Sequence, residues 1–141
     1  MNYYVQAIRK YAVFSGRARR SEYWYFALFN FIFVIVAAVL DNVLHDTFTL
    51  QGQSLMYGYV YLLYALFVFL PGLAVLVRRL HDIGKSGWFF FIVLIPIAGA
   101  IWLLVLLFKD SQPGENQYGP NPKGIGNYSE VDQVGEHLQP Q

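Results

Sequence analysis

Two arginines, a histidine and an aspartate lie close together in the segment Arg78–Trp88, which reads RRLHDIGKSGW. A histidine beside a carboxylate can exchange protons at neutral pH or contribute to a metal site. Arginines can hold a phosphate group, because the planar guanidinium forms two parallel hydrogen bonds with it. The residue types of this segment are therefore compatible with three kinds of chemistry, namely acid-base catalysis, metal binding and anion binding.

The elements that must position this segment are predicted to be membrane helices. The chain of 141 residues is 56% hydrophobic and 13% charged, whereas soluble domains have about 25% charged residues. Three apolar runs without a charged residue or histidine cover about residues 23–40, 55–77 and 88–108. Each run approaches the roughly 20 residues that cross about 30 Å of hydrocarbon. We predict an all-α integral membrane protein, with a domain of three transmembrane helices over residues 15–110.

The two ends of the chain are predicted to differ from this domain. Residues 1–14 place Tyr4, Ile8 and Tyr11 at helical spacing and basic residues elsewhere, a pattern typical of an amphipathic helix that lies in the membrane interface. Residues 111–141 are rich in Gly, Pro, Asn, Gln and acidic residues. We expect an irregular, turn-rich tail there, disordered beyond about Lys123.

Basic residues are segregated along the chain. Five precede or begin the first run and three lie within residues 78–87, whereas the loop 41–54 has two acidic residues and no basic one. Because short cytoplasmic loops are enriched in Lys and Arg, the N-terminus and the segment 78–87 are predicted to be cytoplasmic. Three spans then put the loop 41–54 and the C-terminal tail outside. The basic N-terminal residues are explained by topology and lipid headgroups, so we expect no nucleic-acid partner.

Catalysis and metal binding are not the functions that we favour for the polar segment. A catalytic metal needs three or more protein ligands, and His45 and His137 are predicted on the opposite side of the membrane from His81. Adjacent residues such as His81 and Asp82 do not share a helix face, whereas Arg78 and Asp82 have i, i+4 spacing. The chain has no cysteine for a thiolate nucleophile or a cysteine-based metal site. We expect no metal site and no cofactor, and we favour a structural role for Asp82, with an anion or headgroup site as the alternative.

Three features inside the predicted helices leave a transport function open. They are Asn30, Pro71 with Gly72, and Pro96 before the small residues 98–100. We expect Asn30 to hydrogen-bond to a neighbouring helix, because an amide exposed to lipid is left unmatched. Proline kinks occur in the interrupted helices of transporters, although they are more often packing features.

Three motifs resemble one protein family. They read FSGRARRSEYW at Phe14–Trp24, RRLHDIGKSGW at Arg78–Trp88 and GENQYGPNP at Gly114–Pro122. On these motifs, and over residues 1–123, the chain resembles the small bacterial inner-membrane proteins grouped as domain of unknown function 805, the YhaH-like family. The resemblance implies a polytopic plasma-membrane protein of bacterial type and no established activity.

The motif positions of that family fall on two groups of residues in this chain. The interface cluster comprises Gly16, Arg17, Arg20, Glu22, Trp24, Arg78, Arg79, His81, Asp82, Ser86 and Trp88. The tail motif comprises Asn116, Tyr118, Gly119, Pro120 and Pro122. Three spans separate the tail motif from the cluster by about 30 Å. Either the family has two functional faces, or the topology differs from the one predicted.

The function that we favour is a non-enzymatic inner-membrane module. Its cytoplasmic Arg/Glu/His/Asp cluster would stabilise the helix bundle and dock a membrane-protein partner or anionic lipid headgroups. The alternative is a small transporter or channel subunit, which would have to form a homo-oligomer because three short helices seldom enclose a pathway. An enzyme that acts on lipid headgroups is the third hypothesis, and it requires His81 for turnover.

Overall fold

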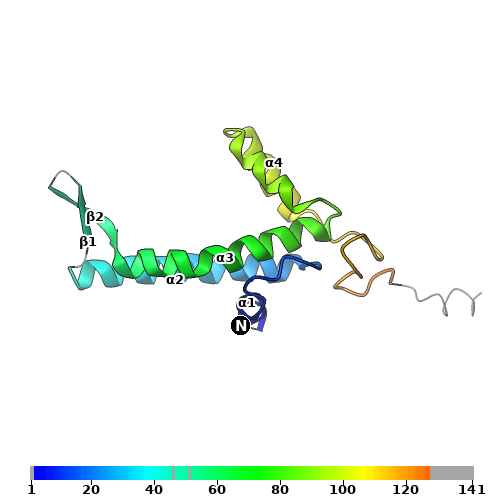
Figure 1. Ribbon diagram of the computed structural model, residues 1–141, viewed down its shortest axis with the longest axis horizontal. Helices are drawn as coiled ribbons and strands as arrows, with labels where there is room; N and C mark the ends of the chain where they lie inside the picture. Colours follow the sequence, from blue (N-terminus) through cyan, green and yellow to red (C-terminus); the bar gives the residue numbers. More distant parts are fainter. Residues whose placement is uncertain (1, 46, 51, 128–141) are drawn as a thin grey trace, which may run out of the picture. The chain divides into compact units, whose positions relative to one another are not determined.

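The computed structural model describes residues 2–45, 47–50 and 52–127. The elements in chain order are α1 (Asn2–Arg9), α2 (Arg20–Val43), β1 (Thr47–Leu50), β2 (Gln53–Gly58), α3 (Tyr59–Asp82), the 3₁₀ helix η1 (Gly87–Leu94) and α4 (Ala98–Phe108) (Figure 1). They form two compact units. The first unit contains residues 1–14 and 21–76, and the second contains residues 15–20 and the chain from Val77 onward.

Helices α2 and α3 are long and apolar enough to cross a membrane. Each has 24 residues, which corresponds to about 36 Å of α-helix. Many of their large apolar side chains are exposed, for example Phe31 at 65% and Leu63 at 67%. The first two predicted spans therefore correspond to helices, but α3 ends five residues later than predicted. As a result, Arg78–Asp82 forms the last turn of a helix and not a loop.

Polar contacts join α2 to α3 within the first unit. The Tyr64 hydroxyl donates to Asn30 Oδ1 at 2.5 Å, so the prediction that Asn30 bonds to a neighbouring helix is confirmed. Near the C-terminal end of α2, the buried carboxylate of Asp41 accepts the N–H groups of Gly58, Val60 and Tyr61 at 2.8–2.9 Å. The first N–H groups of a helix have no partner within it, so Asp41 caps the start of α3.

A β-hairpin that the sequence analysis did not predict connects α2 to α3. Strands β1 and β2 are antiparallel, with Thr47 opposite Gly58, Thr49 opposite Ser54 and Leu50 opposite Gln53. The N-terminal helix is shorter than the predicted residues 1–14, and its Tyr4 ring stacks on Phe26 of α2 at 5.6 Å between centroids.

Residues 88–108 do not form one continuous helix, in contrast to the helix predicted over this run. The run divides into η1 and α4, which pack against each other as a hairpin (Figure 1). Pro96 cannot continue a helix ladder, and Ile97 has φ 61° and ψ −63°. The Ala98 N–H donates to the Pro96 carbonyl at 2.6 Å, which closes a three-residue turn. Gly99 allows the close return, because a Cβ there would lie 1.8 Å from the Ile92 oxygen.

Candidate functional site

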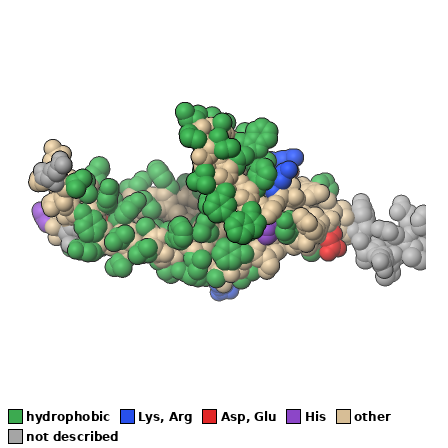
Figure 2. All heavy atoms as spheres, turned by 45° about the horizontal axis from the view of Figure 1, so that its top comes forward, with side chains coloured by type: hydrophobic (Ala, Val, Ile, Leu, Met, Phe, Trp, Pro, Cys, Tyr) green, Lys and Arg blue, Asp and Glu red, His purple; other side chains and the backbone are tan. Residues whose placement is uncertain are grey.

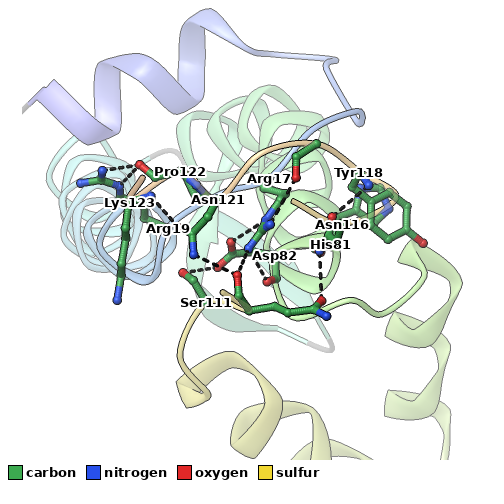
Figure 3. A network of polar contacts seen from close by, with 12 residues as sticks. Arg17, Arg19, His81, Asp82, Ser111, Asn116, Tyr118, Asn121, Pro122 and Lys123 are labelled. Atoms are coloured by element: carbon green, nitrogen blue, oxygen red, sulfur yellow. Dashed lines mark hydrogen bonds and ion pairs between the residues drawn. The ribbon is translucent and has the colours of Figure 1, made fainter. Parts of the chain in front are cut away.

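Arg17 is the centre of a buried polar network in the second unit (Figure 3). Its Nε donates to Asp82 Oδ1 at 3.1 Å. Its Nη1 donates to the carbonyls of Gly114 and Gly119 at 2.8 and 3.2 Å. Its Nη2 donates to the carbonyls of Asp82 and Gln112 at 3.2 and 2.5 Å. A guanidinium has five N–H donors, so every donor of Arg17 has a partner from the chain itself.

Asp82 supplies the negative charge of this network. Its carboxylate is fully buried and accepts hydrogen bonds from Arg17, from Arg79 Nη1 and from the Ser111 hydroxyl. The Asp82 backbone carbonyl also accepts the N–H of Gln112 at 3.0 Å. A single residue at the end of α3 therefore binds both the segment before α2 and the chain after α4.

Two arginines hold the C-terminal end of α4. Arg79 donates to the carbonyls of Leu107 and Lys109, and Arg20 donates to the carbonyl of Phe108 at 3.1 Å. The last carbonyls of a helix lack partners within it and form the negative end of its dipole. Basic side chains at this end therefore stabilise α4 in the place where the chain enters the tail.

The tail motif packs directly on the end of α3. The rings of His81 and Tyr118 stack with centroids 3.7 Å apart and planes 2° apart. Asn116 donates through Nδ2 to the His81 carbonyl at 3.0 Å, and its Oδ1 accepts the N–H of Tyr118 at 2.9 Å. On the histidine ring itself, Nδ1 lies 3.2 Å from the Gly16 carbonyl, a hydrogen bond that requires the proton on Nδ1. The backbone N–H and carbonyl groups of Asn116 and Gly119 pair with each other, which closes the turn.

Further contacts hold the rest of the tail. Arg19 donates to the Pro122 carbonyl at 2.7 Å. The buried side chain of Asn121 donates to the Gln112 carbonyl and accepts the N–H of Lys123. At the exposed edge, Lys123 and Arg20 lie beside Asp110. The hydrogen bond from Lys123 holds the pKa of the Asp110 carboxyl below its ordinary value, with smaller contributions from the Ser111 N–H and from Arg20.

The structure brings together two motifs that were predicted to be separate. The expected separation of about 30 Å is wrong, because Arg17 and His81 contact the tail motif directly. The physical cause is the hairpin of η1 and α4, which returns the chain to the end of α3.

The remaining predicted site residues differ in burial and in the contacts that the structure shows for them. Arg78 is buried, and its carbonyl accepts the N–H of Ala18 at 3.0 Å. Ser86 caps η1 by accepting the Trp88 N–H, and Trp88 is 78% exposed. Glu22 is buried, but it belongs with Trp24 to the first unit. Pro120 is exposed and lies in the tail loop between Gly119 and Asn121.

Sequence reasoning missed several participants in the network. They are Arg19, Ser111, Gln112 and Asn121. Most of the acceptors are backbone carbonyls, which no residue type indicates. Within the described part of the chain, no three His, Asp or Glu side chains come together in a way that could hold a metal ion.

The family of the chain follows from comparison with known sequences. A family profile described as protein of unknown function (DUF805) matches residues 11–120, a range that contains both basic motifs and most of the tail motif. The chain belongs to this family. The inner membrane protein YhaH of Escherichia coli (strain K12) is 42% identical over 125 residues, which cover 87% of this chain and 98% of the relative. The inner membrane protein YhaI of the same strain is 38% identical over 123 residues, which cover 87% and 97%.

The names of these relatives indicate where they are located and give no activity. No solved structure matches the chain significantly. Both relatives are inner membrane proteins, and the chain has two helices of spanning length and composition. The chain is accordingly a bacterial inner-membrane protein of a family of unknown function.

Proposed function

We propose that the chain is a non-enzymatic membrane module with two spans, α2 and α3, and a cytoplasmic platform made by the second unit. The platform consists of the polar network around Arg17 and Asp82, together with the tail residues that it holds. The observation that carries the proposal is the saturation of Arg17, whose five donors are all used to bind the tail and the end of α3.

The distribution of basic residues supports this topology. The segment before α2 and the last turn of α3 share one network. The N-terminal end of α2 and the C-terminal end of α3 therefore belong on the same side of the membrane. With the tail on that side too, all ten Lys and Arg residues of the chain lie there, and none lies in the connection from Leu44 to Gly58. Three spans would place Lys109 and Lys123 on the other side. The excess of basic residues supports the cytoplasm as the shared side.

The contacts of the cluster favour structure over catalysis. The Asp82 carboxylate receives three donors, and the His81 ring is stacked on Tyr118 and bonded to the Gly16 carbonyl. A general base needs an accessible lone pair directed at a substrate. The Asp82 carboxylate instead uses its hydrogen bonds within the chain, and the two contacts of the His81 ring tie the end of α3 to Gly16 and to the tail.

The docking role falls to groups at the edge of the platform. Arg20, Lys85 and Lys109 are exposed, so they remain accessible to an anionic headgroup or to an acidic surface of a membrane-protein partner. A juxtamembrane basic residue contributes about 1 kcal/mol to binding of an anionic leaflet. Arg17 is not such a residue, since phosphate binding would require it to release the tail.

The proposal is tested by recovery of partners and lipids from native membranes after cross-linking. Arg17→Lys keeps the charge but cannot make five hydrogen bonds, so it should release the tail and lose the bound protein or lipid. Arg9→Lys is the matched control, because Arg9 is exposed in α1, and it should retain the wild-type set. An Arg17→Lys protein that is inserted normally and recovers the same partners and lipids would overturn the docking role.

A second candidate is a subunit of an oligomeric transporter or channel. One observation favours it, namely a groove of about 320 Å³ along α2 and α3 that Asn30 and Gly72 line together with apolar residues. This function requires several copies around a pathway. Mass measurement in native-lipid particles distinguishes the two, because a strictly monomeric protein contradicts the transporter.

A further inference from the structure

The hairpin of η1 and α4 has a largely apolar surface. Large hydrophobic side chains are exposed along both arms, and Figure 2 shows them covering its visible face. The most exposed are Trp88, Leu94, Ile95, Ile97, Ile101, Trp102, Val105 and Phe108. Between Gly87 and Phe108 the sequence contains no charged residue. An apolar surface of this extent needs a nonpolar environment.

We infer that this hairpin inserts into the acyl chains of one leaflet, the cytoplasmic one, and does not cross the membrane. The inference rests on the proposed topology, which puts both ends of the hairpin on the cytoplasmic side. It adds a second membrane-binding element to the two spans, with lipid acyl chains as its partner.

The length of the arms fits half of a bilayer. The 11 residues of α4 correspond to about 16 Å at 1.5 Å per residue. The eight residues of η1 correspond to about 16 Å at 2.0 Å per residue. The two arms therefore match each other, and both match half of a hydrocarbon core of about 30 Å. The tip at residues 95–97 would reach the centre of the bilayer.

Three backbone N–H groups at the tip, those of Ile95, Ala98 and Gly99, are paired within the hairpin. The N–H of Ile95 bonds to the Ile92 carbonyl, and Pro96 has no N–H group. The N–H groups of Ala98 and Gly99 bond to the carbonyls of Pro96 and Ile95 at 2.6 and 3.0 Å. Unsatisfied backbone groups in lipid cost several kcal/mol each. A turn in which these donors are paired, with isoleucine on each side of proline, is compatible with that environment.

The base of the hairpin carries groups that belong at the membrane surface. Lys85 precedes the first arm and Lys109 follows the second, and both are exposed. Trp88, at the first turn of η1, is 78% exposed, and tryptophan is enriched at membrane interfaces. Arg79 and Arg20 bind the final carbonyls of α4. The polar network thus holds the base of α4 at the headgroup level while the tip is directed into lipid.

Single-cysteine labelling tests this inference, because the chain has no native cysteine. Ile97→Cys reports on the tip and Gln117→Cys on the exposed tail, and each variant is treated with a membrane-impermeant maleimide in spheroplasts and in inside-out vesicles. We expect the thiol of Gln117→Cys to react only in inside-out vesicles and the thiol of Ile97→Cys to react in neither. A bimane fluorophore attached to the Ile97→Cys variant should be quenched most by lipids brominated near the ends of their acyl chains.

The outcomes distinguish a failure of leaflet insertion by the hairpin from a failure of the proposed topology. Reaction at position 117 only from outside overturns the proposed topology itself. With position 117 cytoplasmic, reaction at position 97 from either side overturns leaflet insertion. Protection at position 97 without lipid quenching, together with a disulfide between the introduced thiols of two Ile97→Cys chains, overturns it as well and assigns the hairpin to contact between copies. Ile97→Cys is suited to the test because cysteine is not β-branched and tolerates the turn at least as well as isoleucine.

Discussion

Arg17 and Asp82 are 65 positions apart in sequence and are joined by a buried ion pair, with Nε 3.1 Å from Oδ1. The pair connects the segment before the first long helix to the last residue of the second. The remaining donors of Arg17 bind carbonyls of the tail and of Asp82 itself. One guanidinium therefore holds three separate segments of the chain together.

Arg17→Lys should detach the tail while the long helices remain. Lysine has a single ammonium in place of the planar fork, so most of the carbonyls that Arg17 binds lose their donor. We expect faster hydrogen exchange at the Gln112 amide, which bonds to the Asp82 carbonyl in the network, and no change at the Tyr61 amide, which bonds to Asp41. Unaltered exchange at Gln112 would contradict the role given to Arg17.

Asp82→Ala should be strongly destabilising, because it leaves Arg17 and Arg79 buried without their counter-charge. Removing one partner of a buried ion pair typically costs about 3–5 kcal/mol. A double-mutant cycle with Arg17→Ala, measured as the free energy of unfolding in micelles, should give a coupling of about 0.5–3 kcal/mol. The same cycle with Arg9→Ala is the control and should be additive. Additivity of Asp82→Ala with Arg17→Ala would show that the pair carries no coupling.

Ile97→Gly should stabilise the protein. Ile97 is β-branched and has φ 61°, a region where such residues are strained by about 1–3 kcal/mol. Ile101→Gly, in the interior of α4, is the matched control and should destabilise by about 1 kcal/mol. The comparison of the two variants by thermal unfolding in micelles checks the turn. If both glycine variants lose stability to the same extent, residue 97 is not in a strained turn.

The contact between Asp110 and Lys123 predicts that the stability of the folded protein decreases slightly at acid pH. The hydrogen bond from Lys123 lowers the pKa of Asp110 in the folded protein. The contribution of the Asp110 carboxylate to folding stability is therefore complete above the ordinary carboxyl pKa, and it is lost as the pH falls through the lowered pKa. Lys123→Gln should raise the pKa of Asp110 toward its ordinary value in an NMR titration of the carboxyl carbon. A titration curve that is the same in both proteins would exclude this contact.

The parts of the structure that the sequence predicted are those with strong local signals. Helices α2 and α3 follow from long apolar runs, and the interhelical bond of Asn30 follows from the cost of a lone amide in lipid. Arg17 was singled out by the family motif that contains it, and Asp82 by its motif and by its i, i+4 spacing to Arg78. For the helices and for Asn30 the deciding property belongs to the residues themselves.

The parts that the sequence did not predict depend on contacts between distant segments. A run of 21 apolar residues, from Trp88 to Phe108, has the length of a span, and composition alone does not distinguish a span from two arms of a hairpin. The difference is made by the turn at Pro96 and Ile97 and by the close approach that Gly99 allows. Without this turn, a continuous third span would separate the tail from the cluster. The contacts between Arg17 and the tail cannot be predicted from residue types either, because Arg17 donates to backbone carbonyls of the tail.

The stacked pair His81 and Tyr118 gives the most direct test of the docked tail. With no native cysteine in the chain, His81→Cys and Tyr118→Cys can be combined and treated in native membranes with a short bifunctional maleimide. We expect an intramolecular cross-link, and none in the control pair His81→Cys with Gln53→Cys, because Gln53 lies in β2, before the start of α3, and His81 lies at the end of that helix. Absence of the cross-link between positions 81 and 118, with each cysteine separately reactive, would show that the tail does not dock on α3 and would restore a third span that separates the two positions by about 30 Å.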